Sequence, residues 1–411
     1  MRHLSASWTR SAGPRHLVLA AVLVLATGCS PEGSETGTTG SPAATATGSP
    51  TGPGPGDRTG PGPGGPGGGE AMPTPGFLSS PDCPAGSTAA ATPSGAAGTD
   101  RAAAVLAATQ AFLSTLDAEQ KTAVAAERSQ ANLSQWSNLP DQLFKRAGLR
   151  MDKLNSDQQA AVAKILQAAL SEQGYRQVTQ ITTADGVLAD QGGMNLDFGA
   201  DHYWIRILGT PSASETWTLQ YGGHHLAVNA TMAGNAMTLA PTFWGAQPAG
   251  YTEASTEVEP LCGETVKAFK LIGALDETQR KAAVLTTPVT EIVLGAGKDG
   301  KTLAAEGVKA STFTAEQKTL LLDLVSEWIT PLNAEQAAAK LKAAQDNLDA
   351  TTFAWYGATE IGNPIYYRIQ GPTFTIEFAH QQGGGANAGG ITHIHSIYRE
   401  PGNDYGAELG S

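Results

Sequence analysis

Gly148-Leu-Arg-Met-Asp-Lys-Leu-Asn-Ser-Asp-Gln-Gln159 aligns without a gap on Gly307-Val-Lys-Ala-Ser-Thr-Phe-Thr-Ala-Glu-Gln-Lys318, and this repeated stretch decides the fold. Two further blocks repeat in the same order. Residues 111–121 are echoed by residues 268–281, and the strand-like residues 203–211 by residues 366–372. Three blocks at a nearly constant offset predict an internal duplication from about residue 102 to residue 411.

The repeated blocks carry the signals that start helices. Asn155 and Thr314 each place a side-chain oxygen three residues before a glutamine, which satisfies free N–H groups of a first helical turn. Asp117 and Asp276 do the same, and Asn333 indicates a further helix start. Apolar residues then recur at helical spacing and predict one core-facing side for each helix. They are Val162, Ile165, Leu166 and Leu170 in the first copy, and Leu321, Leu324, Val325 and Ile329 in the second.

After each group of helices the apolar pattern changes to a period of two residues, which indicates strands. We therefore expect an α+β fold in which each copy forms helices followed by an antiparallel sheet of about three strands. The helices would cover one face and leave a polar one. The copies span residues 82–260 and 261–411, and we expect them to pack about a pseudo-two-fold axis into one domain. The buried face should hold Ile205, Ile207, Leu219, Tyr221, Leu226 and Val228, and then Tyr367, Ile369, Ile376, Phe378, Ile394 and Tyr398.

Several of these segments resemble a known protein family. Tyr221-Gly-Gly-His-His-Leu226, Tyr366-Tyr-Arg-Ile-Gln-Gly-Pro372 and His393-Ile-His-Ser-Ile-Tyr-Arg399 through Asn403-Asp-Tyr-Gly406 look like the exported bacterial family catalogued as domain of unknown function three thousand five hundred. The likeness covers most of the chain after residue 81. It implies an exported protein of this architecture, and it implies no activity and no catalytic residues.

Six of the eight histidines lie in the two repeats. His393 and His395 are two residues apart on an expected strand, so their rings should point the same way. Glu377 is expected on a neighbouring strand of the same face, and His225 in the first copy. Three imidazoles and a carboxylate suit zinc or copper as a cofactor. The alternatives are histidines that only hydrogen-bond to water and neighbours, or that transfer protons.

Two more histidines are candidate ligands. His224 alternates with His225 and should point to the apolar face, unless the flanking glycines form a turn in which the adjacent pair chelates a metal. His380 lies at the start of a glycine-rich loop, residues 381–390, that could fold over the polar face, whereas His202 is expected at the surface.

Arg206 and Arg368 occupy matched strand positions on the histidine-bearing face. A guanidinium group there could bind a carboxylate, phosphate or sulfate. The alternative is a structural ion pair such as Arg368 with Glu377. Residues 295–302 match a phosphate-binding loop by letter, but Gly307 interrupts the helix that such a loop requires, so we interpret this stretch as a turn.

The first 28 residues predict an export signal, because three arginines precede a short apolar run and small residues precede Cys29. A cysteine at this place resembles a bacterial lipoprotein, in which the thiol is lipidated, for example with palmitate. Residues 29–81 are mostly Gly, Pro, Ser, Thr and Ala, which predicts a disordered tether. We therefore expect an extracytoplasmic protein anchored to the cell membrane through Cys29.

Charge and cysteine content narrow the partners further. The formal net charge of −12 becomes −15 once the three arginines of the leader are removed, so we expect no binding to nucleic acid. Cys83 and Cys262 most simply form one disulfide in an oxidising compartment. A catalytic thiol is the alternative.

These observations lead to three hypotheses of function. The first is a metal-assisted hydrolase in which His225, His393 and His395 bind the metal, Glu377 is a ligand or general base, and Arg206 and Arg368 hold an anionic group. The second is a non-catalytic surface module that recognises a glycan or an anion through its arginines and aromatic residues. The third is a structural surface protein without a small-molecule site.

Overall fold

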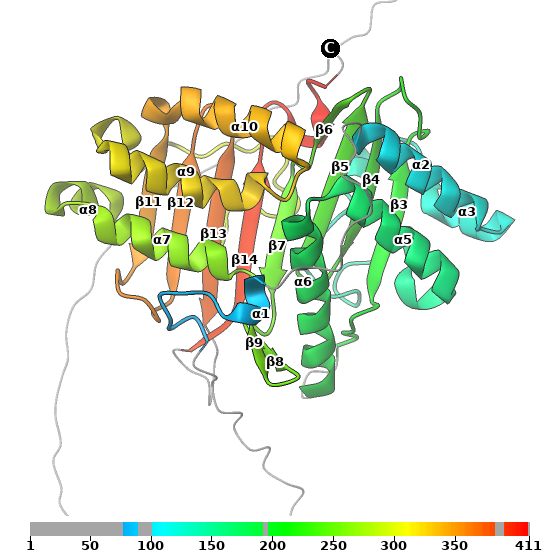
Figure 1. The fold of residues 1–411 in the computed structure, drawn as a ribbon, viewed down its shortest axis with the longest axis horizontal. Coiled ribbons are helices and arrows are strands. Elements are labelled where there is room, and N and C mark those ends of the chain that lie inside the picture. The colour runs from blue at the N-terminus through cyan, green and yellow to red at the C-terminus, as the bar shows by residue number, and fades with distance from the viewer. Residues whose placement is uncertain (1–76, 89–100, 192–195, 383–389, 410–411) are drawn as a thin grey trace, which may run out of the picture. The chain divides into compact units, whose positions relative to one another are not determined.

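Strands from both halves of the chain join into one sheet in the computed structural model of the protein (Figure 1). In chain order they are β1 (Ala125–Ala126), β2 (Leu149–Arg150), β3 (Tyr203–Leu208), β4 (Trp217–Gly223), β5 (Leu226–Ala233), β6 (Ala236–Thr238), β7 (Thr242–Ala246), β10 (Val308–Lys309), β11 (Thr352–Gly357), β12 (Ile365–Gln370), β13 (Thr375–Gln382) and β14 (Ile391–Arg399). Their order in the sheet is β1-β3-β4-β5-β7-β14-β13-β12-β11-β10, with β2 beside β3 and β6 beside β5. A separate hairpin is formed by β8 (Tyr251–Glu253) and β9 (Thr256–Val258).

The structure describes residues 77–88, 101–191, 196–382 and 390–409. All of them belong to one compact unit, residues 68–411. The expected export signal, the lipidation site Cys29 and the tether up to residue 76 lie outside the described residues. Within the described ranges, no helix is both long and apolar enough to cross a membrane.

Most of the helices cover one face of the sheet, and the expected capping residues start five of them. Asp117, Asn155, Asp276 and Thr314 each form a complete capping box with the glutamine three residues later. Asn333 also caps its helix through its side chain. The α-helices are α1 (Ala85–Thr88), α2 (Arg101–Ser114), α3 (Ala118–Val124), α4 (Gln130–Leu133), α5 (Ser156–Ala169), α6 (Glu172–Gln191), α7 (Cys262–Ala274), α8 (Glu277–Ala283), α9 (Ala315–Ile329) and α10 (Ala334–Asp346).

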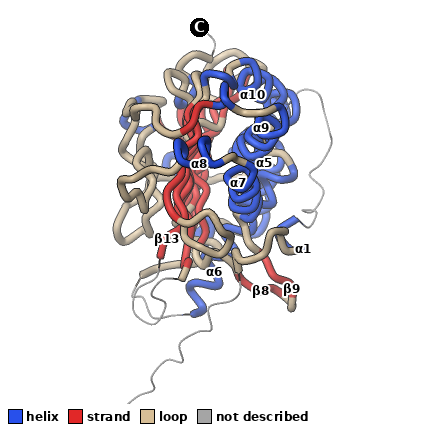
Figure 2. The backbone as a smooth tube through the Cα atoms, turned by 90° about the vertical axis from the view of Figure 1, so that its left-hand side faces the viewer, coloured by secondary structure: helices blue, strands red, loops and turns tan. Residues whose placement is uncertain are grey.

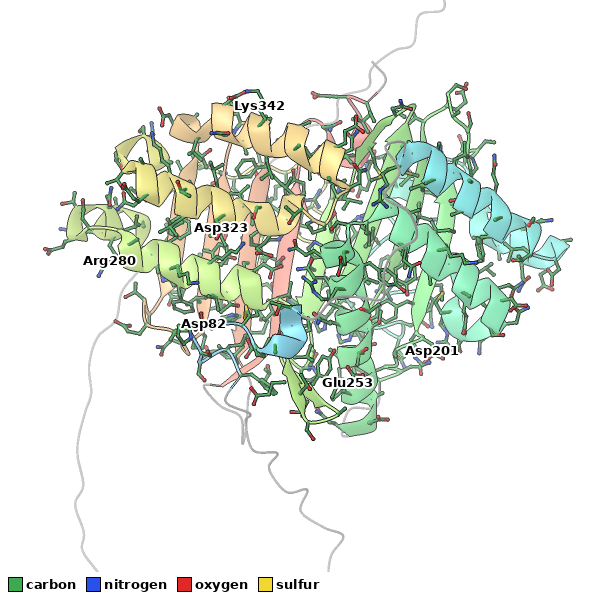
Figure 3. The ribbon with its side chains drawn as sticks, viewed as in Figure 1. Asp82, Asp201, Glu253, Arg280, Asp323 and Lys342 are labelled. Atoms are coloured by element: carbon green, nitrogen blue, oxygen red, sulfur yellow. A yellow bond between two sulfur atoms is a disulfide. The ribbon has the colours of Figure 1, made fainter. Side chains whose placement is uncertain are left out.

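The main core lies between this helical layer and the sheet, which Figure 2 shows edge-on. All twelve strand residues expected on the buried face belong to this core, as do the apolar stripes of α5 and α9. The outward sides of the helices carry charged residues such as Asp323 and Lys342, which are largely exposed (Figure 3). The α+β class and the helix-facing side of the sheet are therefore confirmed.

The second face of the sheet differs from the polar, open surface that we expected. Two long segments cover it: residues 127–148, which contain α4, and residues 285–307. In Figure 2 this side of the sheet is mostly loops, opposite the layer formed by the other helices. The two segments close a smaller apolar cluster on that face. The cluster includes Leu133, Trp136, Phe243, Leu294, Ile397 and Tyr405. Charged residues on this face are consequently buried, and their partners are in the protein.

The third repeated block pairs strands that occupy different places in the sheet. Residues 203–211 contain β3, whereas residues 366–372 belong to β12. The strand in the second half that occupies the place of β3 is β11, because β2 pairs with β3 as β10 pairs with β11. Each half also contributes four long strands or more to the shared sheet, and not about three.

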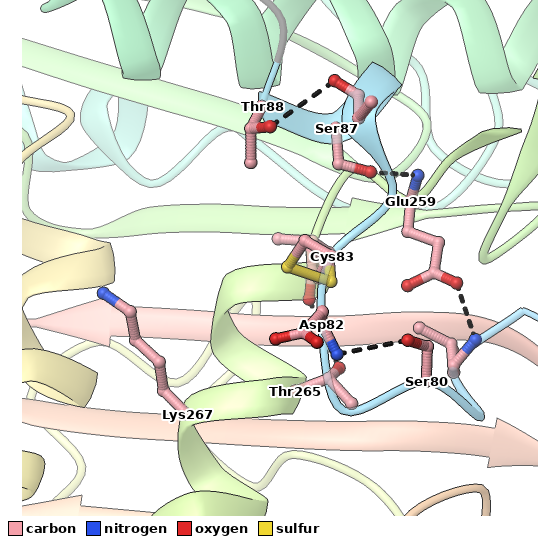
Figure 4. The surroundings of a disulfide bond; sticks show 12 residues. Ser80, Asp82, Cys83, Ser87, Thr88, Glu259, Thr265 and Lys267 are labelled. Carbon is pink, nitrogen blue, oxygen red and sulfur yellow. Dashed lines mark hydrogen bonds between the residues drawn. A yellow bond between two sulfur atoms is a disulfide. The ribbon is translucent and has the colours of Figure 1, made fainter. Parts of the chain in front are cut away.

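The chain already packs against the domain before the expected end of the tether at residue 81. Leu78 is 2% exposed, and its N–H donates to the buried carboxylate of Glu259 at 2.7 Å. A disulfide joins Cys83 to Cys262 at the start of α7, as Figure 4 shows. Ser87 accepts a hydrogen bond from the backbone N–H of Glu259 at 2.7 Å. This N-terminal segment, residues 77–88, is thus fixed to the middle of the chain, and the expected disulfide is present.

Candidate metal centre

Three histidines from the two halves of the chain meet on the loop-covered face of the sheet. His225 lies in the turn between β4 and β5, and His393 and His395 lie on β14. Strand β7 runs between these elements and pairs with both β5 and β14. Each of the three histidines offers one ring nitrogen, and these nitrogens lie within 4.8 Å of one another.

The turn that carries His225 brings its ring onto the sheet. Gly223 pairs with Leu226, so His224 and His225 form a two-residue connection, in which His225 adopts a φ of 59°. This left-handed conformation is unfavourable for a residue with a Cβ and tends to persist where the surroundings or a function require it. The carbonyl of His225 accepts a hydrogen bond from the N–H of Gly245 at 2.8 Å. A side chain at residue 245 would come within 3.3 Å of the His225 Cβ, so glycine leaves room for the ring.

The closest approach in the cluster is between His225 and His395, whose Nε2 atoms are 3.0 Å apart. The ring of His393 has its centroid 5.3 Å from that of His225 and 4.9 Å from that of His395. His393 Nδ1 is 3.0 Å from the hydroxyl of Thr392. Nitrogens this close either share a proton or face a common cation.

Glu291 contacts the ring of His395 at Nδ1. Its carboxylate oxygens lie 2.8 and 3.0 Å from His395 Nδ1, on the opposite side of the ring from Nε2. A carboxylate in this position accepts the Nδ1–H and leaves the Nε2 lone pair available to a metal. His225 Nδ1 has no hydrogen-bond partner among the described residues. The side chain of Glu291 is 50% exposed, so the centre lies close to solvent on this side.

Burial keeps two of the three imidazoles neutral. It lowers the pKa of His393 to about 3, and the neighbouring His395 and His224 act in the same direction. Burial also places the pKa of His225 well below its usual value, with further contributions from His224, His395 and His393. Neutral imidazole is the form that binds metals.

His224 and His380, the other two expected ligands, point to the helical side of the sheet. His224 Nδ1 lies 2.6 Å from a carboxylate oxygen of Asp185 on α6. His380 Nε2 lies 3.2 Å from the hydroxyl of Thr265 on α7. The structure brings neither ring into the three-histidine cluster, although the ring of His224 stacks 3.8 Å from that of His225.

Glu377 lies on the expected face but away from the histidines. It is fully buried and accepts hydrogen bonds from the Tyr366 hydroxyl at 2.6 Å and from the backbone N–H groups of Val293 and Leu294. Its strand partners are Arg368 and Ile397. The carboxylate therefore fixes the covering segment 285–307 to the sheet.

The two candidate arginines are also engaged with the covering segments. Arg368 donates to Glu306 at 2.7 Å, and not to Glu377 as the alternative interpretation expected. Arg206 donates to the side chains of Asn132 and Gln135 in the other covering segment. Burial lowers the pKa of Arg206. The structure brings neither guanidinium group to the three histidines.

The carboxylate that does reach the cluster, Glu291, was not singled out from the sequence. It lies in an irregular segment without apolar periodicity, so the pattern contains no signal for its position. The nearest indication is Ile292-Val-Leu294, an apolar run that packs against the sheet and sets Glu291 beside β14.

Comparison with known proteins identifies one family. The family described as "Protein of unknown function (DUF3500)" matches residues 99–407. No curated protein and no solved structure matches the chain.

Proposed function

Because the chain belongs to the DUF3500 family of proteins of unknown function, we propose a function from its own residues: it binds a transition metal through His225, His393 and His395. The observation that carries this proposal is the convergence of three ring nitrogens within 4.8 Å. Two of these imidazoles are held neutral, and the third is oriented by a carboxylate.

The spacing of the nitrogens agrees with a shared ion. Bonds of about 2.0–2.1 Å at tetrahedral angles place ligand nitrogens about 3.3 Å apart. The Nε2 atoms of His225 and His395 are 3.0 Å apart, and a ring nitrogen of His393 lies within 4.8 Å of the other two ligand atoms. Three imidazoles suit zinc or copper, and they leave one coordination position open.

An open position on such an ion would make hydrolysis the reaction class that the site favours. Zinc bound by three protein ligands lowers the pKa of a bound water to about 7, which supplies a nucleophile at neutral pH. Glu291 would orient His395 by accepting its Nδ1–H. We propose no ligand or base role for Glu377 and no anion-binding role for Arg206 and Arg368, because their side chains bind the covering segments.

Elemental analysis of the protein, purified without a histidine tag, tests this proposal. We expect the wild-type protein to carry or take up about one equivalent of zinc or copper per chain. The double variant His393→Ala with His395→Ala should lose it. The matched control is His202→Ala, which removes a surface histidine that contacts Asp197.

A wild-type protein that neither carries nor binds zinc or copper would overturn the proposal. For the reaction class, the measurement is hydrolysis of p-nitrophenyl acetate by the metal-loaded protein. Activity should disappear with a chelator and in the double variant. Metal binding without any activity above that of the double variant would leave a binding protein and remove the hydrolase.

We also propose that the protein is exported and held at the membrane by a lipid on Cys29. The support is the leader sequence and the Cys83–Cys262 disulfide, since disulfides persist mainly in oxidising compartments. Mass spectrometry of the N-terminal peptide should find acyl chains on Cys29. Their absence, or a free N-terminus at another residue, would contradict the anchor.

The order of the elements supports an internal duplication. Each half contains, in this order, two helices, a short strand followed by a 3-10 turn, two further helices and four strands, with β1, α4 and β6 as additions in the first half. The strands of the first half, β3-β4-β5-β7, meet those of the second, β14-β13-β12-β11, in mirrored order. A pseudo-two-fold axis between β7 and β14 would produce this order.

A further inference from the structure

A pocket of about 440 Å³ opens beside the candidate metal centre. Gln381 lines it, and Gln381 is the strand partner of His393 across β13 and β14. Directly opposed residues of an antiparallel pair point to the same face, so the two side chains are neighbours. Thr290 also lines the pocket, and it immediately precedes Glu291, whose carboxylate holds His395. The pocket therefore adjoins the centre through Gln381 and Thr290.

The lining of this pocket is polar but uncharged. Among the described residues around it, no side chain carries a formal charge at neutral pH. The polar groups are amides, a hydroxyl-bearing residue and an aromatic ring with a hydroxyl, which combine hydrogen-bond donors and acceptors. They belong to Gln381, Gln382, Asn363, Thr290 and Tyr356.

Two details support the neutrality and order of this lining. His380, whose ring bonds to Thr265 on the helical side of the sheet, adds no charge to this lining, because burial lowers its pKa to about 3. Gln381 donates through Nε2 to the carbonyl of Thr290 at 2.9 Å, which fixes the amide and turns its oxygen to accept a further bond. Asn363 is fixed in the same way, by donating to the carbonyl of Glu360.

We infer that this pocket binds an uncharged ligand rich in hydroxyl and amide groups, namely a neutral sugar unit, next to the three histidines. Fixed amides pair with hydroxyl and acetamido groups without the desolvation cost of burying a charge. The half-buried ring of Tyr356 supplies an apolar surface of the kind on which a sugar ring packs. This inference rests on the proposed metal centre, which would supply the reaction chemistry. It adds that the substrate of that centre is a neutral sugar.

A second, larger pocket has the opposite character. It measures about 540 Å³ and is lined by Asp299, Lys301, Arg399 and Asp404. Arg399 already pairs with both aspartates. We therefore expect an anionic ligand to bind in this second pocket, at Lys301, and not in the pocket beside His393. The experiment therefore compares a neutral sugar, expected in the first pocket, with a charged sugar, expected in the second.

Calorimetric titration with chitotriose, a neutral acetamido sugar, and with trigalacturonate, a charged trisaccharide, tests the inference on the metal-loaded protein. We expect chitotriose to bind. Ala358→Trp places a large ring at the exposed mouth of the pocket, at the end of β11, and should weaken this binding by about tenfold or more. Ala350→Trp is the matched control, because Ala350 is an exposed alanine just before the other end of β11.

The possible outcomes distinguish the sugar site from the metal centre. Absence of chitotriose binding, binding of trigalacturonate alone, or equal affinity in Ala358→Trp and wild type would overturn the inference. Metal content is measured on the same samples. A protein that holds metal but no sugar loses only this inference, whereas one that binds sugar at the pocket but never metal loses only the proposed metal centre.

Discussion

Gly245 determines where the ring of His225 can lie. A Cβ at this position would come within 2.6 Å of the Ile394 carbonyl and 2.9 Å of the Phe243 ring, and both groups belong to the packed sheet. We predict that Gly245→Ala lowers the free energy of unfolding by about 1–3 kcal/mol, because overpacking displaces backbone or ring. It should weaken metal binding as well. Urea unfolding and metal titration measure the two effects.

Gly273 provides the control for this substitution. It lies in α7, and a Cβ added to it would have no neighbouring atom of the described residues within 4 Å, so alanine fits there. Gly273→Ala should raise the free energy of unfolding by about 0.5–1 kcal/mol through helix propensity. Equal stability changes in the two variants would contradict the role given to Gly245.

Glu291 is expected to affect metal affinity without affecting the fold. Its side chain is half exposed and bonds to His395 Nδ1. Removing a carboxylate behind a ligand histidine commonly lowers metal affinity about 10–100-fold. Glu291→Ala should show this loss, and Glu291→Gln a smaller one, since its amide oxygen still accepts the Nδ1–H. Competition with a chelating dye measures the affinity; identical values in all three proteins would remove Glu291 from the centre.

At the scale of elements, the packing of α6, α7 and α9 contains a buried acid. Glu264 on α7 is 1% exposed, accepts a hydrogen bond from Gln177 on α6 at 2.8 Å, and faces Glu327 on α9. Burial, followed by the charge of Glu327, raises its pKa well above the usual value. The folded protein therefore holds this proton at pH values where the unfolded chain has lost it.

The sign of the pH effect follows. Between the unfolded and folded pKa values of Glu264 the folded state binds more protons, so the contribution of this group to stability is fully present at low pH and declines as pH rises above about 4.5. We predict that Glu264→Gln makes the free energy of unfolding less dependent on pH in this range. Glu277→Gln, at an exposed position of α8, is the control. Urea unfolding at a series of pH values measures this dependence. If the free energy of unfolding varies with pH in Glu264→Gln as it does in the wild type, Glu264 is not the group responsible.

The elements that the sequence predicted are those in which apolar residues recur with a regular period. The stripes of α5 and α9 and the alternation in β4, β5, β12 and β13 gave correct core positions because only one face of each was expected to be apolar. Strand β7 was not predicted because its sequence, Thr-Phe-Trp-Gly-Ala, does not alternate between apolar and polar residues. The segments that cover the second face have no period, so neither they nor the burial of that face could be predicted.

The same reasoning explains the site. Strand parity correctly placed His225, His393 and His395 on one face, and His224 on the other. Parity does not give the position along a strand, however. Glu377 is opposite Ile397, two residues beyond His395 on β14, and a buried backbone segment occupies its carboxylate. Glu291 depends on how that segment packs, which no local pattern contains.

For the molecule as a whole, the disulfide closes a long loop. Cys83 and Cys262 are 179 residues apart, and the bond holds the N-terminal segment against the domain. We predict that Cys83→Ser with Cys262→Ser lowers the free energy of unfolding by roughly 2–5 kcal/mol, because the unfolded chain regains freedom. Urea unfolding of the two proteins measures the loss. Cys29→Ser is the control and should leave stability unchanged; an unchanged double variant would show that the bond contributes nothing.

Strand β7 meets its two neighbours unequally. It pairs with β14 over five residue pairs but with β5 over two, Leu226 with Trp244 and Ala227 with Phe243. The rings of His225 and His395 approach each other across β7, next to these two residue pairs. An ion bound by both rings would add a link between β14 and the start of β5, where β7 pairs with β5 over only two residue pairs. Amide hydrogen exchange at Ala227 and Phe243 should accordingly slow on metal loading, while exchange within β12 and β13 stays constant.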